Sequence, residues 1–128
     1  MEAKEFWQRL CEDSDYRFFA GIPFAEVEDL YKNMDSEIMH YVPAANEHIA
    51  LKLASGAWTS GFKSAIILPG KLVNNLDLEF NMKFGIPVLI ITTENGLSLS
   101  KKKQAKKDLN KAKDYIEKNL KPEIFLLN

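Results

Sequence analysis

Short apolar runs alternate with longer amphipathic stretches along the whole chain, and this alternation predicts strands joined by helices. The runs that predict strands are 16–20, 38–42, 64–68, 87–93 and 123–127. The run 64–68 is almost continuously apolar, which is typical of a parallel strand buried on both faces. Proline stands first in the run 87–93, a position that strands tolerate.

The stretches between these runs repeat apolar residues every three or four positions, as amphipathic helices do. The helices predicted in this way are 2–12, 24–34, 47–60, 72–84 and 101–120. Connections long enough to hold helices favour right-handed crossovers between parallel strands. The sequence therefore predicts one three-layer α/β/α domain, residues 1–128, with a mainly parallel sheet of about five to six strands.

Two local signals mark where a strand ends and a helix begins. Pro23 suits the first turn of the helix 24–34. Asn46 suits a helix N-cap, which puts Glu47 in the first turn of the next helix. In open α/β sheets ligands bind outside the carboxyl ends of the strands, so Glu47 is a candidate site residue. The alternative is a carboxylate that complements the helix dipole, with an effect below about 1 kcal/mol.

Composition excludes several classes of function. The formal net charge is −1, so no overall attraction to nucleic acid or membranes is expected. The lysines of 101–113 fall on the outer face of an amphipathic helix, which argues against a nucleic-acid site. The single cysteine, Cys11, cannot form an internal disulfide and suits a reducing cytoplasm. No signal peptide, membrane span or metal-ligand spacing is expected.

Four short stretches occur in the order of a known family. They are Gly-Ile-Pro at 21–23, Tyr-Val-Pro-Ala-Ala-Asn-Glu at 41–47, Leu-Pro-Gly-Lys-Leu-Val-Asn at 68–74 and Ile-Pro-Val-Leu at 86–89. With them, residues 20–91 resemble the pyrimidine-binding (PYR) domain of thiamine-diphosphate decarboxylases, in particular the phosphonopyruvate and sulfopyruvate decarboxylase group. The third stretch departs from the family loop and keeps only Leu72 and Asn74.

The resemblance implies roles for individual residues. Glu47 would be the catalytic glutamate that hydrogen-bonds the cofactor pyrimidine and assists its activation. The other cofactor-binding positions implied are Pro23, Asn46 and Asn74. The substrate positions implied are Phe24, Ala25, His48 and Lys71. Phe24 and Ala25 stand where the family usually carries a serine within two residues of the Gly-Ile-Pro turn.

The diphosphate half of such a site is missing from the sequence. The family holds the diphosphate and Mg²⁺ with a Gly-Asp-Gly loop, whereas none of the six glycines here forms a Gly-x-Gly. The resemblance therefore implies the α subunit of a split enzyme, with a partner subunit holding the diphosphate and metal. The activity expected is phosphonopyruvate decarboxylation. The alternatives are sulfopyruvate decarboxylation, a non-catalytic PYR-like partner module, and a domain taken from a longer enzyme.

Overall fold

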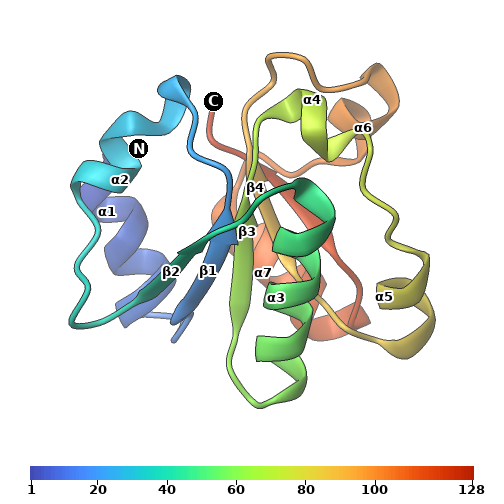
Figure 1. The fold of residues 1–128 in the computed structure, drawn as a ribbon, viewed down its shortest axis with the longest axis horizontal. Coiled ribbons are helices and arrows are strands. Elements are labelled where there is room, and N and C mark those ends of the chain that lie inside the picture. The colour runs from blue at the N-terminus through green and yellow to red at the C-terminus, as the bar shows by residue number, and fades with distance from the viewer.

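Five parallel strands form one sheet in the order β2-β1-β3-β4-β5 at the centre of the computed structural model, which describes residues 1–128 (Figure 1). The strands are β1 (Phe18–Gly21), β2 (His40–Pro43), β3 (Ser64–Ile67), β4 (Leu89–Thr92) and β5 (Glu123–Leu126). Helices cover both faces, so the predicted three-layer α/β/α fold is confirmed. Each strand overlaps its predicted run, and β1 and β2 extend one residue beyond it.

One helical layer packs on a core that includes Phe19, Ile67 and Phe125. Its elements are α1 (Ala3–Trp7), the π-helical segment η1 (Gln8–Glu12), the 3₁₀ turn η2 (Ala25–Val27), α2 (Glu28–Lys32) and α7 (Leu109–Asn119). The opposite layer packs on a second core, around Ala54 and Ile66. Its elements are α3 (Glu47–Thr59), α4 (Gly70–Val73), α5 (Glu79–Phe84) and α6 (Leu99–Gln104).

The carboxyl ends of β2, β1 and β3 lie side by side at one end of the sheet, called the carboxyl edge. Gly21 pairs in register with Pro43 on one side and Ile67 on the other. A Cβ at Gly21 would lie 2.1 Å from the Ile67 carbonyl oxygen, so only glycine fits. The segments that follow β1, β2 and β3 therefore leave the sheet side by side at its carboxyl edge.

The prediction of a single helix over 72–84 is wrong, because two short helices, α4 and α5, occupy this part of the chain. The Asn74 side chain donates to the Gly96 carbonyl and accepts from the Ser98 N–H, both at 2.8 Å. Asp77 then accepts from the Glu79 N–H at 3.1 Å. Asparagine and aspartate make such backbone contacts in turns and so interrupt helices.

The helix predicted over 101–120 is also broken, into α6 and α7. Asp108 caps α7 by accepting from the Lys111 N–H at 3.1 Å.

The helix predicted over 24–34 is shorter in the structure, and Pro23 precedes its first turn because Phe24 is extended, with φ −146°. No helix combines the length and the apolar character that a bilayer crossing requires.

The two edge strands end the sheet differently. Beside β5, the Lys106 N–H donates to the Ile124 carbonyl at 2.8 Å, and the Lys106 carbonyl accepts from the Leu126 N–H at 2.9 Å. Beside β2, the Ala44 N–H points at β1, so the residue before it faces outward. That residue is Pro43, which has no N–H to offer.

Candidate active site at the carboxyl edge of the sheet

Glu47 is the first residue of α3 and follows β2 by a three-residue turn. Asn46 is the N-cap, in the extended conformation (φ −155°, ψ 174°), and its Oδ1 accepts from the Ile49 N–H at 2.9 Å. This confirms the local structure predicted at Asn46. The cap fixes the first turn, and the Glu47 side chain is only 14% exposed.

His48 is the neighbour that Glu47 meets most directly. Glu47 Oε1 lies 3.7 Å from His48 Nε2, and the imidazole is 54% exposed. The carboxylate is thus shielded while the imidazole beside it remains open to solvent. Carboxylate and imidazole are the side chains most often used to move protons, so this pair is the candidate acid–base group at the carboxyl edge.

The turn after β1 lies next to the Glu47 turn. The Ile22 N–H donates to the Ile67 carbonyl at 3.2 Å, and the Ala44 N–H donates to the Gly21 carbonyl at 2.8 Å. These bonds bring the expected cofactor and substrate positions of the two turns onto the same edge. Pro23 and Ala25 are exposed there, whereas Phe24 is half-buried and packs on the α1–α2 core.

Lys71 and Asn74 belong to a separate cluster beyond β3 and β4. Lys71 is exposed on α4, and both side-chain polar atoms of Asn74 bond to the loop after β4. A Cβ on Gly70 would lie 2.5 Å from the Asn95 carbonyl oxygen, so this loop packs directly on the α4 backbone. No hydrogen bond or ion pair joins this cluster to Glu47.

The structure adds polar residues that sequence reasoning missed. Glu26 in η2 accepts from Thr93 Oγ1 at 3.1 Å and from Asn95 Nδ2 at 3.2 Å. Lys107 pairs with Glu94 at 3.1 Å. The polar residues 94–96, directly after the predicted strand 87–93, were the sequence signal for this part of the edge. Nothing local pointed to Glu26, which lies 67 residues before Thr93.

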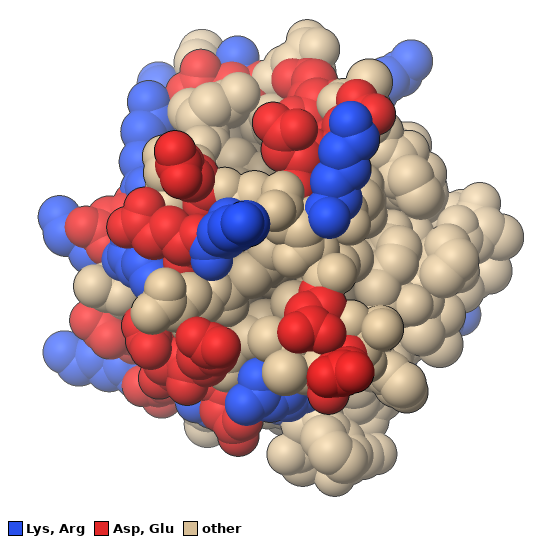
Figure 2. Space-filling model, turned by 90° about the vertical axis from the view of Figure 1, so that its left-hand side faces the viewer, with Lys and Arg blue, Asp and Glu red and all other residues tan.

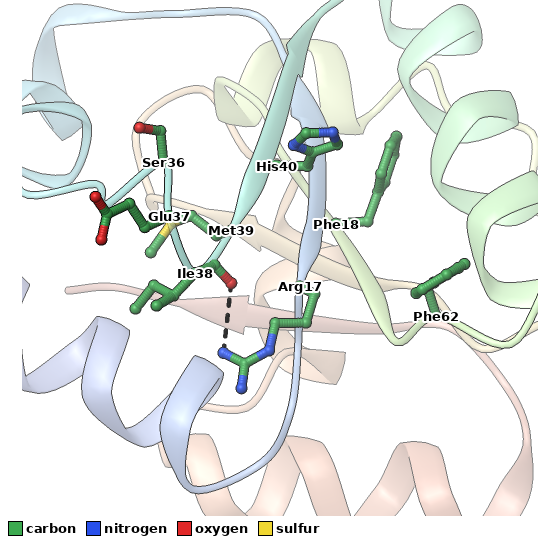
Figure 3. A pocket seen from close by; sticks show the side chains of 8 residues that line it. All are labelled: Arg17, Phe18, Ser36, Glu37, Ile38, Met39, His40 and Phe62. Carbon is green, nitrogen blue, oxygen red and sulfur yellow. Dashed lines mark hydrogen bonds between the residues drawn. The ribbon is translucent and has the colours of Figure 1, made fainter.

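The structure has one groove beside the candidate site and one pocket away from it. A groove of about 810 Å³ between α3 and α5 is lined at one end by His48. A smaller pocket of about 310 Å³ lies at the opposite, amino ends of β1 and β2 (Figure 3). In that pocket the Arg17 guanidinium already pairs with Asp15 at 3.2 Å and donates to the Ile38 carbonyl at 3.4 Å.

Nowhere in the chain do three or more His, Cys, Asp or Glu side chains come together in a way that would hold a metal ion. The Glu26 carboxylate, which lies at the carboxyl edge, is occupied by a hydroxyl and an amide donor. Both of these bonds of Glu26 are made within the chain, to the loop that follows β4.

The fold has a counterpart among solved structures. A 2-oxoglutarate:ferredoxin oxidoreductase from Magnetococcus marinus, solved with 2-oxoglutarate, coenzyme A and succinyl-CoA bound, matches 98% of this chain with a TM-score of 0.67. The chain has the fold of part of that 2-oxoacid enzyme. The sequence identity is 17%, so the likeness is one of fold, and the chain spans 28% of the oxidoreductase chain. No family model matches this sequence, and no curated protein does.

Proposed function

We propose that this chain is the pyrimidine-binding subunit of a two-chain, thiamine-diphosphate-dependent 2-oxoacid decarboxylase. The observation that carries the proposal is Glu47, shielded in the first turn of α3 at the carboxyl edge of the sheet. The residues around it match the PYR-domain motif, and the fold matches part of an enzyme whose substrate, 2-oxoglutarate, is a 2-oxoacid. The sequence motif supports this substrate class, and the fold is compatible with it.

The pyrimidine half of the cofactor fits the residues at this edge. Thiamine diphosphate, when bound, supplies a nucleophilic carbon and an electron sink for the decarboxylation of 2-oxoacids. Glu47 would share a proton with the pyrimidine ring, because its carboxylate is shielded from water and its position is fixed by the Asn46 cap. Pro23 would contribute the exposed wall of the neighbouring turn.

The diphosphate half does not fit this chain. No Gly-x-Gly loop opens a helix in the sequence, and no cluster of ligands for Mg²⁺ exists in the structure. Glu47 would therefore act on a cofactor whose diphosphate and metal are held by a second subunit. The whole site would then lie between the two chains.

The substrate is proposed to carry a phosphonate or sulfonate group beside its 2-oxoacid. His48 and Lys71 are exposed basic residues, and they flank the carboxyl edge from α3 and α4. Both would attract an anionic group on the substrate. The sequence motif covers both acids, and we propose phosphonopyruvate first and sulfopyruvate as the alternative.

A non-catalytic PYR-like module is the second candidate function, and two observations favour it. Phe24 stands at a substrate position but packs on the core. Asn74 stands at a cofactor position, yet its amide is already bonded to Gly96 and Ser98. A module of this kind would bind the second subunit without taking part in the reaction.

Reconstitution distinguishes the two candidates. The chain is mixed with the product of a neighbouring reading frame that encodes a Gly-Asp-Gly diphosphate domain, with thiamine diphosphate and Mg²⁺ present. Release of CO₂ from phosphonopyruvate or sulfopyruvate, dependent on both chains, supports the decarboxylase. A stable complex that releases no CO₂ from either acid supports the non-catalytic module.

A further inference from the structure

α5 stands away from the sheet and presents apolar side chains to solvent. Phe80 is 61% exposed and Phe84 is 59% exposed, and their rings pack on each other with centroids 4.7 Å apart. Met82 is exposed on the same six-residue helix. Large apolar side chains gathered on one element mark an interaction surface more often than isolated ones do.

The helix on the other side of the groove is poor in charge. Between residues 48 and 62 the only Lys, Arg, Asp or Glu is Lys52, and Ile49 is 40% exposed. In Figure 2 the right-hand side of the molecule, which is the side where α3 faces the viewer of Figure 1, shows few charged residues. Depletion of charge at the centre of a surface is a feature of protein–protein interfaces.

The groove has an exposed aromatic side chain on its rim and one charged residue of each sign beside it. It holds about 810 Å³ between α3 and α5, and the exposed Phe80 projects on its rim. Lys52 flanks the groove on α3 and Asp77 flanks it just before α5. Neither forms an ion pair within the chain. A surface that carries a projection, a groove and one charge of each sign can pair with its own copy about a two-fold axis.

We infer that the α3–α5 groove is the interface of a homodimer of this chain. In this dimer Phe80 of each copy enters the groove of the other, and Lys52 of each copy faces the partner's Asp77. The inference does not depend on the cofactor assignment. None of the loops that follow β1, β3 and β4 lines the groove, so they would remain free to meet another subunit.

Sedimentation of the purified chain tests this inference. The wild-type chain is expected to be a dimer at micromolar concentrations. Phe80→Asp should raise the dimer dissociation constant by about 100-fold, because each dimer loses two apolar anchors worth roughly tenfold each. Leu99→Asp is the matched control, because Leu99 is an exposed apolar residue on α6 that does not line the groove. It should leave the dimer unchanged.

Charge reversal tests the two-fold geometry itself. Lys52→Asp alone and Asp77→Lys alone should each weaken the dimer by about 100-fold, because like charges then face each other twice. An equimolar mixture of the two single variants should form a heterodimer, because each aspartate again faces a lysine. Thermal unfolding checks that both variants fold.

Three results would overturn the inference. If the wild-type chain stays monomeric, the α3–α5 groove is not a homodimer interface, and its partner would be a different protein. A dimer that tolerates Phe80→Asp as well as Leu99→Asp uses another surface. A mixture of the two charge variants that stays monomeric shows that Lys52 and Asp77 do not face each other across a two-fold axis.

Discussion

Asn81 Nδ2 donates a hydrogen bond of 2.8 Å to Ser55 Oγ, and this bond ties α5 to the middle of α3. The same amide group donates to the Ile86 carbonyl at 3.2 Å. Asn81 is the one buried residue of α5. Asn81 is therefore the side chain of α5 that ties this helix to α3 across the groove.

Asn81→Ala should release α5 from the rest of the fold. The substitution removes both bonds and leaves the Ile86 carbonyl without this donor, for a loss of about 1–3 kcal/mol in the free energy of unfolding. Amide hydrogen exchange should become faster across 79–84 while α7 keeps its protection. Asn75→Ala, at an exposed asparagine without a side-chain bond, should change neither quantity. Unchanged exchange across 79–84 in Asn81→Ala would show that other contacts hold α5.

Glu47→Gln should abolish cofactor activation without unfolding the chain. The amide keeps the shape and one hydrogen bond but cannot share a proton, and such acid–base contributions are worth about 10²–10⁴ in rate. Stability should change by less than about 1 kcal/mol, the usual effect of a first-turn carboxylate. The measurement is hydrogen–deuterium exchange at the thiazolium carbon with the second subunit present. Glu79→Gln, in the first turn of α5, is the control, and equal rates in both variants would remove Glu47 from the mechanism.

Thiamine diphosphate should bind the isolated chain no tighter than about 1 mM, because neither a phosphate-cradling loop nor a metal site is present. Titration calorimetry in the presence of Mg²⁺ measures this affinity. Micromolar binding by this chain alone would contradict the two-chain site, whatever the reconstituted pair does.

The Cys11 thiol should be unreactive in the native protein. Burial raises its pKa from 9.0 to about 11, so very little thiolate exists near neutral pH. The thiolate is the reactive form, and the side chain is also buried. An aromatic disulfide reagent that releases a coloured thiol should label Cys11 slowly at pH 8 and rapidly once urea unfolds the chain. Equal rates in the two states would mean that η1 opens readily.

The protein should lose stability in alkali. Burial raises the pKa of Tyr16 well above its ordinary value of 10.0. The unfolded chain then releases the phenol proton at a lower pH than the native chain does, so the contribution is present below pH 10 and declines above it. The expected slope is about 1.4 kcal/mol per pH unit above pH 10.

Tyr16→Phe should make this alkaline decline shallower in urea titrations at several pH values. Some slope should remain, because burial also raises the pKa of Tyr31. Curves of equal slope for the two proteins would contradict the assignment to Tyr16.

The strands were predictable from the sequence because burial on both faces leaves a continuous apolar run, as at 64–68. The breaks in the two long helices were not. The bond from Asn74 to Gly96 and the pairing of Lys106 with Phe125 join residues about 20 positions apart, and helical periodicity does not report such partners.

In the candidate site, too, residues marked by a local sequence signal were predicted, whereas those with distant partners were not. Glu47 was placed correctly at a helix N-terminus because its signal, the Asn46 cap, is adjacent in sequence. Glu26 was missed because its partners Thr93 and Asn95 lie 67 and 69 positions later in the sequence. The polar residues 94–96 showed that the loop after β4 is hydrophilic, but not which side chain crosses to meet it.

Pro43 and Lys106 limit the addition of further strands at the two margins of the sheet. A sheet grows into a fibre by adding a strand from another molecule to a free row of backbone donors and acceptors. Proline removes a donor at the β2 margin, and the Lys106 backbone occupies the β5 margin. Concentrated solutions should therefore contain discrete particles rather than linear polymers. A substitution such as Pro43→Val would restore a donor at the β2 margin and expose the sheet to strand-by-strand growth.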